Sequence, residues 1–457
     1  MTKIDRVRLE DLIVRERERF AREHPRSAQS FEETGRTLVG GVPMSWMAMW
    51  AGGFPLFFDE AHGARLTDVD GHKYVDLCLG DTGAMAGHAP PATVEAVERQ
   101  VRRGTTTMLP SEDAAAVGGE LSRRFGLERW QFALTATDAN RWVLRMARHV
   151  TGRSKVLVFS YCYHGSVDEA FVVVGDGQPR SRPGNVGPAI DPTVTTKVVE
   201  FNDTAALEAA LAPGDVACVL AEPALTNIGI VLPEPGFHDT LRELTRATET
   251  LLVIDETHTF SAGPGGYTGT CGLEPDVVTI GKAIGGGVPV AAYGMTAELA
   301  DRTLASPDAD LEDTGGVGGT LAGNALSLAA TRATLERVLT DEAFDKMLRL
   351  AERHERAVND VLDSRKLAWH VVRLGARAEY RFCATPPRTG GEAAAASDAA
   401  LDAYVHLYLM NRGVLITPFH NMALMCPATV PADVDRHAEV FAAAADELIG
   451  CGPPPAP

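Results

Sequence analysis

The stretches LLVIDETHT, residues 251–259, and VVTIGKAIGGG, residues 277–287, decide the fold. Each begins with a continuous apolar run, without the alternation typical of a strand with one face in water. Such runs indicate strands buried on both faces, and therefore a parallel sheet covered by helices. KVLVF at 155–159 and VACVLA at 216–221 have the same character. From about residue 90 the runs alternate with helical stretches, so the sequence predicts an α/β fold.

In such a sheet, ligands bind beyond the carboxyl ends of the strands. The residues after the four runs are therefore the candidates for chemistry: Ser160 onward, Glu222, Asp255 and Lys282. An unpaired buried carboxylate at Asp255 would be costly, so we expect a cationic group to face it. Lys282 follows its strand by two residues and precedes the glycine run 285–287, which places its amine at a strand end against flexible backbone.

A helix is predicted to begin at Thr135, because apolar residues recur with helical spacing from 139 to 150 and threonine is a good N-cap. The free amides of a helix N-terminus can bind a phosphate, although ordinary capping is the alternative. Tyr163, His164 and Gly165 follow the strand that ends at residue 159. The tyrosine could stack on a planar cofactor or belong to the core.

The composition excludes several classes of protein. The 43 Lys+Arg against 61 Asp+Glu give a net charge of −18, which argues against a nucleic-acid or anionic membrane partner. The seven cysteines never occur in CxxC spacing, so neither a disulfide framework nor a metal site is expected. Residues 1–26 lack the apolar core of a signal peptide, and no apolar stretch reaches the roughly 18 residues of a membrane helix. We expect a cytoplasmic protein.

The pattern also suggests a division of the chain. We expect an N-terminal segment with a small strand meander over 1–89, a large domain over 90–325, and a C-terminal part of a small domain over 326–457. Finer expectations are an amphipathic helix at 8–23, strands at 56–58, 65–68, 378–382 and 414–417, a long helix after 324, and loops at 175–192, 306–319 and 386–397.

Together and in this order, these motifs resemble the class III aminotransferases, fold-type I enzymes that depend on pyridoxal 5′-phosphate (PLP) and include ω-transaminases and glutamate-1-semialdehyde aminomutase. The resemblance covers nearly the whole chain. It rests on GG at 40–41, DVDGHKYVDL at 68–77, YHG at 163–165, AEP at 221–223, IDE at 254–256, IGKAIGGG at 280–287 and GGT at 318–320. It implies a mostly parallel sheet of the seven-stranded type, a small α+β domain built from both termini, and a homodimer with shared active sites.

The resemblance also implies roles for individual residues. Lys282 would form a Schiff base with PLP and shuttle the proton, and Asp255 would keep the pyridine nitrogen protonated. The backbone amides of Ala136 and Thr137 would bind the phosphate. The remaining cofactor contacts would be Tyr163 stacked on the ring, the adjacent His164, Glu222 in the polar network behind it, Thr257 on the opposite ring face, and Thr320 reaching the phosphate of the neighbouring subunit.

The chain departs from the family pattern in two cofactor positions. Ala136 stands where the family usually has glycine, which would cost strain if that position required positive φ. Thr257 replaces the usual valine. We expect both changes to be tolerated.

The substrate pocket is expected to be apolar. Family members that bind a substrate carboxylate have an arginine near the GG motif, whereas residues 42–50 here offer Met44, Trp46, Met47 and Trp50. Residues 417–426 contain no arginine either. We therefore expect a ping-pong transaminase that moves an amino group from a hydrophobic primary amine to pyruvate or a similar oxo acid. The alternatives are glutamate-1-semialdehyde 2,1-aminomutase, a β-amino-acid aminotransferase and a non-catalytic PLP-binding regulator.

Overall fold

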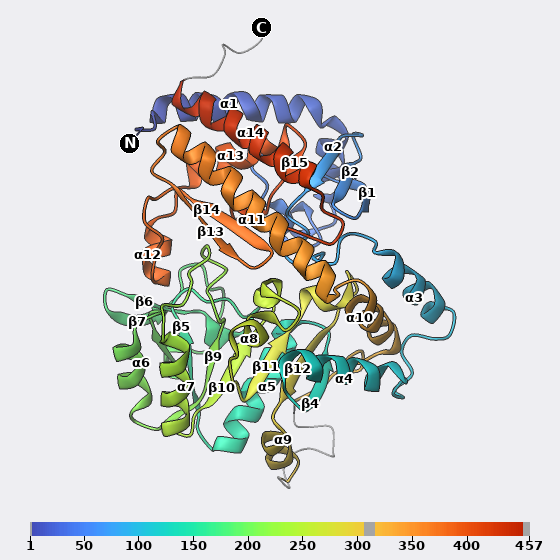
Figure 1. Ribbon diagram of the computed structural model, residues 1–457, viewed down its shortest axis with the longest axis vertical. Helices are drawn as coiled ribbons and strands as arrows, with labels where there is room; N and C mark the ends of the chain where they lie inside the picture. The colour runs from blue at the N-terminus through green and yellow to red at the C-terminus, as the bar shows by residue number, and fades with distance from the viewer. Residues whose placement is uncertain (1, 306–315, 451–457) are drawn as a thin grey trace. The chain divides into compact units, whose positions relative to one another are not determined.

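The structure is a computed structural model that describes residues 2–305 and 316–450. The chain forms two compact units (Figure 1). Unit 1 contains Met1–Ala89, Asp345–Pro386 and Ala396–Pro457, and unit 2 contains Pro90–Phe344 and Pro387–Ala395. Unit 1 is therefore built from both ends of the chain, and unit 2 from its middle.

Unit 2 is organised around a seven-stranded sheet. Five neighbouring strands are parallel, and β12 runs antiparallel between β11 and β4. The four apolar runs predicted from sequence are four of these strands, and the α/β fold with a mostly parallel sheet is confirmed. The strand order is β4 (Arg129–Ala133), β12 (Ala291–Met295), β11 (Val277–Ile280), β10 (Leu251–Asp255), β9 (Val216–Ala221), β5 (Lys155–Phe159) and β8 (Thr196–Val199).

Helices cover this sheet, and two of them support the candidate site. Helix α5 packs across β9, β11 and β12, and α10 packs against the 3-10 turn η6 (Lys282–Gly285). The helices of unit 2 are α3 (Pro91–Val101), α4 (Asp113–Phe125), α5 (Ala136–Thr151), α6 (Thr204–Leu211), α7 (Phe237–Ala247), α8 (Gly266–Cys271), α9 (Ala297–Leu304), α10 (Ala325–Arg337) and α12 (Gly390–Ala395). Short 3-10 turns are η3 (Asp168–Ala170), η4 (Pro192–Val194) and η5 (Thr259–Ala262).

Unit 1 joins the two chain ends through a parallel strand pair, β3 with β15. Its two sheets have the orders β1-β2-β3-β15 and β13-β14-β16. The strands are β1 (Phe58–His62), β2 (Arg65–Asp68), β3 (Lys73–Asp76), β13 (His370–Leu374), β14 (Arg377–Arg381), β15 (Val414–Leu415) and β16 (Met422–Leu424). The helices are α1 (Arg6–Glu23), α2 (Pro25–Thr34), the turns η1 (Val39–Gly41) and η2 (Ser45–Ala48), α11 (Asp341–Ser364), which arrives from unit 2, α13 (Ala399–Met410) and α14 (Pro431–Ile449).

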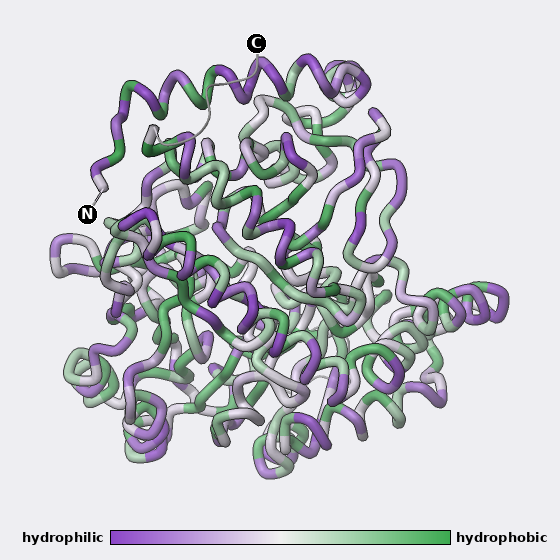
Figure 2. Tube along the Cα trace, turned by 45° about the horizontal axis from the view of Figure 1, so that its top comes forward, coloured by the Kyte–Doolittle hydropathy of each residue, from purple (hydrophilic) through white to green (hydrophobic). Residues whose placement is uncertain are grey.

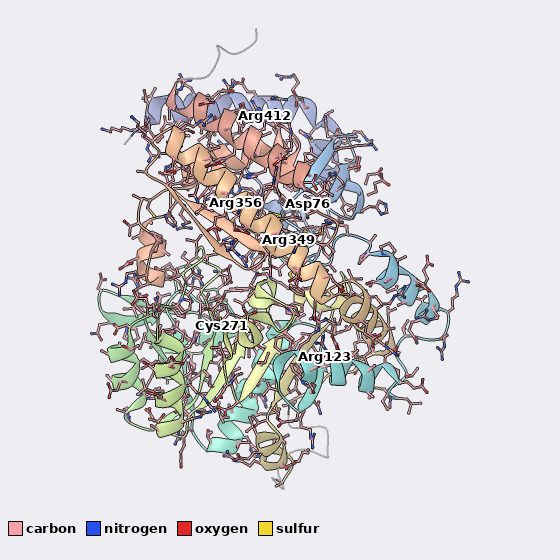
Figure 3. The ribbon with its side chains drawn as sticks, viewed as in Figure 1. Asp76, Arg123, Cys271, Arg349, Arg356 and Arg412 are labelled. Carbon is pink, nitrogen blue, oxygen red and sulfur yellow. The ribbon has the colours of Figure 1, made fainter. Side chains whose placement is uncertain are left out.

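The predicted N-terminal helix is α1, and Figure 2 shows hydrophilic and hydrophobic residues alternating along it. It packs against α13 and α14, and its buried Glu16 accepts hydrogen bonds from the Arg412 guanidinium at 2.9 and 3.1 Å. Arg412, labelled in Figure 3, also lies over the Tyr408 ring. The guanidinium of Arg412 is therefore paired with Glu16 within unit 1.

Four expectations about local structure are wrong. The expected loop at 175–192 begins with a hairpin of β6 (Val172–Gly175) and β7 (Gln178–Ser181). No hydrophobic pattern predicts β7, because all of its residues are exposed. The loop at 386–397 contains α12, a six-residue helix. The long helix after residue 324 is two helices, α10 and α11. The strand placed at 56–58 begins only at Phe58. Residues 306–315 of the remaining expected loop lie outside the described residues.

The six cysteines within the described ranges are free thiols. The cysteine pattern could not reveal a cluster of His24, Asp68 and His72, whose potential ligand atoms lie within 4.8 Å of one another. Hydrogen bonds account for the cluster, because Asp68 accepts from His72 and from the Tyr74 hydroxyl. Within residues 2–305 and 316–450, no helix has the length and apolar character needed to cross a membrane.

Candidate active site

The candidate site of unit 2 begins where β10 and β11 end. These neighbouring parallel strands are in register, with Asp255 opposite Thr279. Asp255 is the last residue of β10, and Lys282 lies two residues beyond β11. The sheet therefore brings a carboxylate and an amine to adjacent strand ends, as the sequence predicts.

Asp255 is buried and accepts three hydrogen bonds. His164 Nδ1 lies 2.9 Å and Asn140 Nδ2 2.8 Å from its Oδ2, and the amide of Thr257 donates to Oδ1 at 3.0 Å. Burial acts to raise the pKa of Asp255, but these bonds, above all that from His164, lower it below its usual value. The site therefore holds a carboxylate that stays ionised although it is buried.

His164 is the cationic partner within the protein. Burial acts to lower the pKa of this imidazole, but the nearby Cys162 sulfur and the Asp255 carboxylate raise it well above its usual value. Asn140 completes the network, because its Nδ2 also donates to the His164 carbonyl and its Oδ1 accepts from Thr279. Asn140 was not predicted, because its only signal in the sequence is that of a polar residue on the buried face of α5.

The N-terminus of α5 (Ala136–Thr151) presents free backbone amides. Thr135 is its N-cap and accepts from the amide of Asp138 at 3.1 Å, as predicted. Ala136 and Thr137 are the first two helical residues, whose amides have no acceptor inside a helix. Because Ala136 has a helical backbone, its methyl group causes no strain there.

Two glycines allow other segments to approach this helix end. Gly165 has φ +79°, and a Cβ there would lie 2.1 Å from Thr137 Oγ1. A Cβ on Gly281, the residue before Lys282, would lie 3.1 Å from the Ala136 methyl. The glycines of YHG and IGK therefore bring the ends of β5 and β11 to the start of α5.

Lys282 is half-buried at the first position of η6. Its φ is +48°, a left-handed value that is uncommon for a residue with a side chain and that concentrates at functional sites. Its Nζ lies 2.8 Å from His258 Nε2. His258 stands in the DETHT stretch, but only the structure brings it to the lysine.

Tyr163 and Glu222 form a second layer of the site. Glu222 is buried, its Oε1 accepts from the amide of Tyr163 at 3.1 Å, and its Oε2 accepts from the amide and hydroxyl of Thr226. Burial raises the pKa of Glu222 above its usual value. The Tyr163 ring meets Phe171 edge to face, with ring centroids 6.4 Å apart. Glu222 therefore fixes the backbone that carries Tyr163.

The two remaining threonines lie in different surroundings. Thr257 is buried, and within the described part of the chain its Oγ1 has no hydrogen-bond partner. Thr320 is an exposed residue in the turn before α10.

The predicted apolar segment belongs to unit 1 and contains η2. Met44 and Met47 are exposed, with 44% and 45% of their surface accessible. The Trp46 ring lies 5.6 Å from that of Phe419, and Trp50 packs against the core cluster that contains Phe20. Core packing therefore accounts for Trp50, and the two methionines form an open apolar surface.

The groups assembled in unit 2 fit the parts of PLP. The start of α5 suits a phosphate, the ionised Asp255 suits a protonated ring nitrogen, and Lys282 offers an amine for the aldehyde. The unpartnered Thr257 hydroxyl beside Asp255 is a further polar atom that a bound group could satisfy. The residues present therefore fit the cofactor.

Comparisons with known proteins agree with this geometry. Residues 46–442 match the family model described as aminotransferase class-III. The chain is 32% identical over 416 residues to glutamate-1-semialdehyde 2,1-aminomutase of Anaeromyxobacter sp. (strain Fw109-5), covering 90% of this chain and 95% of that protein.

Solved structures show the same relationship. A glutamate-1-semialdehyde-aminomutase from Pseudomonas aeruginosa PAO1 superposes with a TM-score of 0.95 at 51% identity, covering 97% of this chain and 99% of that one. A lysine-to-alanine variant from the same organism, in complex with PMP, gives a TM-score of 0.94. An ω-transaminase from Sphaerobacter thermophilus gives 0.83 at 29% identity, covering 92% and 97%. The chain belongs to the class III aminotransferases and is a PLP-dependent enzyme.

Proposed function

We propose that the site of unit 2 holds PLP and moves an amino group between carbon atoms of small-molecule substrates. The observation that carries this proposal is the pairing at adjacent strand ends of an ionised, buried Asp255 with Lys282 on a left-handed backbone. When bound, PLP supplies an electron sink that stabilises the charge left when a substrate carbon loses its proton.

The protein's own groups have separate tasks in this proposal. Lys282 holds the cofactor through its amine and later takes and returns the substrate proton at Nζ. Asp255, kept ionised by His164, would bind the ring nitrogen of the cofactor and keep it protonated. The amides of Ala136 and Thr137 bind the phosphate at the start of α5.

The residues around the ring orient it and exclude water. Tyr163, whose amide is bound by Glu222, would cover one face of the bound ring and Thr257 the other, and His164 binds Asp255. Thr320 contributes its hydroxyl to the phosphate of a second subunit, so that the working enzyme is a homodimer with shared sites. Its exposure in the single chain is compatible with such a contact.

Among the functions expected from the sequence, we infer glutamate-1-semialdehyde 2,1-aminomutase as the first candidate. The similarity to proteins of that name spans nearly the full length of both chains, at 51% identity for the structure from Pseudomonas aeruginosa. These relatives favour our alternative expectation over the amine transaminase. An aminomutase keeps its nitrogen within one molecule and needs no external acceptor.

An amine transaminase stays the second candidate because of one specific observation. Residues 42–50 and 417–426 contain no arginine, and Arg412, the nearest in the C-terminal part, is bound to Glu16. A substrate carboxylate thus lacks its expected partner in either segment, and the open methionine surface suits an apolar amine.

One pair of assays separates the candidates. The holoenzyme is incubated with glutamate 1-semialdehyde alone, and the formation of 5-amino-4-oxopentanoate is measured. In parallel, 1-phenylethylamine and pyruvate are supplied, and acetophenone and alanine are measured; a third arm replaces the amine with a β-amino acid. Acceptor-independent isomerisation supports the aminomutase, acetophenone supports the transaminase, and bound PLP without turnover in any arm contradicts both and supports a non-catalytic regulator.

A further inference from the structure

His258 contacts the atom on which the proposed reaction depends. It lies three residues beyond the end of β10, and Lys282 lies two residues beyond β11, the neighbouring parallel strand. The distance between His258 Nε2 and Lys282 Nζ is 2.8 Å, a full hydrogen bond.

Both partners of this contact are held in place by their surroundings. His258 is 8% exposed, and its carbonyl accepts from the amide and hydroxyl of Ser261, which fixes the start of η5. Lys282 is fixed by its left-handed backbone and by Gly281, which packs against Ala136. The contact is therefore a feature of the fold and not of two mobile surface chains.

The number of protons in this contact decides what it can do. Two nitrogens at hydrogen-bond distance share one proton, so an ammonium on Lys282 can donate to the lone pair of a neutral imidazole. A protonated imidazole would place an N–H bond and a second positive charge against the ammonium. The hydrogen bond to a lysine ammonium therefore exists only while His258 is neutral.

Other titratable groups at this edge of the sheet have partners of their own. Asp255 and His164 bind each other. Glu256, next to Asp255, accepts from the Thr259 hydroxyl in η5 and from two backbone amides of α8. Glu222 accepts from the Thr226 amide and hydroxyl.

We propose that His258 is a positioning residue for Lys282: its neutral Nε2 accepts a hydrogen bond from the ammonium and holds that ammonium while the lysine carries the substrate's proton. In this step the substrate C–H bond breaks, an N–H bond forms on Lys282, and the electron pair stays with the cofactor-bound substrate. His258 gains no proton, and the ammonium returns its proton to the substrate. The proposal rests on the proposed function of Lys282.

The test compares two variants with a matched control. His258→Leu removes the acceptor, His258→Gln supplies a side-chain oxygen that accepts a hydrogen bond but does not titrate, and His62→Leu removes an exposed histidine of unit 1. For the full-length chain without cofactor, the labelling of Lys282 by acetic anhydride is followed against pH by peptide mass spectrometry. For the holoenzymes, kcat and KM are measured from pH 5.5 to 9.

The expected results have a definite sign. Without the acceptor the ammonium is less stable, so Lys282 of His258→Leu becomes reactive about one pH unit lower than in the wild type, the size expected for one hydrogen bond to a charged group. Its kcat falls about tenfold with KM within about twofold, because the interaction belongs to the proton transfer. His258→Gln restores most of kcat, because its side-chain oxygen also accepts a hydrogen bond from the ammonium, and its kcat depends less on acidic pH than that of the wild type, because an amide does not titrate. His62→Leu matches the wild type.

Two results would overturn the proposal: an unchanged labelling profile in His258→Leu, or a loss of kcat in His258→Gln as large as in His258→Leu with normal cofactor loading. The labelling arm needs no substrate, so it also separates this proposal from the proposed function. A shifted labelling profile with no turnover on any substrate refutes the proposed function and leaves the contact between the two residues established. Turnover with an unshifted profile refutes only the role of His258.

Discussion

Asp255→Asn is the substitution whose effect follows most directly from the geometry. The change is nearly isosteric, but it replaces a carboxylate that accepts from His164, Asn140 and the Thr257 amide. An asparagine must turn its NH₂ group toward one of these donors, and it cannot keep a ring nitrogen protonated by charge. The pKa of His164 should fall in this variant, because one of the groups that raise it is gone.

The magnitude comes from the hydrogen bond between the carboxylate and the cationic ring nitrogen. Such a charge-assisted bond is worth about 1.5–3 kcal/mol, which corresponds to a loss of about 10- to 150-fold in kcat. The assay is kcat at saturating substrate, with cofactor loading measured by absorbance and folding by thermal unfolding.

The matched control is Asp276→Asn. Asp276 is another carboxylate of unit 2 with three hydrogen bonds, two from Arg242 and one from the Leu252 amide. The Asp276→Asn substitution should lower the unfolding temperature and leave kcat nearly unchanged. A fully loaded Asp255→Asn enzyme with kcat within about threefold of the wild type would show that the Asp255 carboxylate does not have this role in the reaction.

Two further predictions concern stability. Gly165→Ala should lower the free energy of unfolding by about 1–2 kcal/mol because of its positive φ and by about 1–3 kcal/mol more because of the clash with Thr137, and it should weaken PLP binding. Gly177→Ala, also at positive φ but with open space around it, should show only the first loss in urea unfolding. Equal effects of the two variants would exclude the clash. His354 and His437 of unit 1 are buried with ring centroids 4.5 Å apart, and within the described ranges none of their ring nitrogens has a hydrogen-bond partner. Burial lowers the pKa of His354 to about 4. Below about pH 6.5 the unfolded chain therefore protonates this histidine while the folded chain does not. The free energy of unfolding is highest above that pH and falls by about 3 kcal/mol as the pH approaches 4. In His354→Leu, urea unfolding between pH 7 and 5 should show a weaker pH dependence than in the wild type, and an unchanged dependence would contradict the role of the buried pair.

The strands that the sequence predicts are those with the strongest physical signal. β9, β10 and β11 are buried at every residue, so their sequences are continuous apolar runs. β12 is equally buried, but its sequence AAYGM has small residues and a glycine and gives no such signal. β7 is exposed throughout and gives no hydrophobic pattern at all.

The same division holds for the site. Asp255 and Lys282 could be located from sequence because each follows a strand that its own residues identify. Asn140 could not, because it meets Asp255 from 115 residues away through the packing of α5 on the sheet. His258 meets Lys282 only because β10 and β11 are neighbours in register. Contacts that depend on strand order leave no mark in the local pattern.

Lys282 is proposed to bind the cofactor through its amine, and reductive trapping identifies the lysine that does so. The PLP-loaded protein is reduced with borohydride and digested, and the cofactor mass is located by peptide mass spectrometry. Lys155→Ala, which removes a lysine at the opposite end of a strand of the same sheet, is the control. We expect the cofactor mass on the peptide with Lys282 in the wild type and in Lys155→Ala, and no visible band and no trapped cofactor in Lys282→Ala. Trapping on any other lysine, or a Lys282→Ala protein that keeps the band and full turnover, would show that Lys282 does not bind the cofactor.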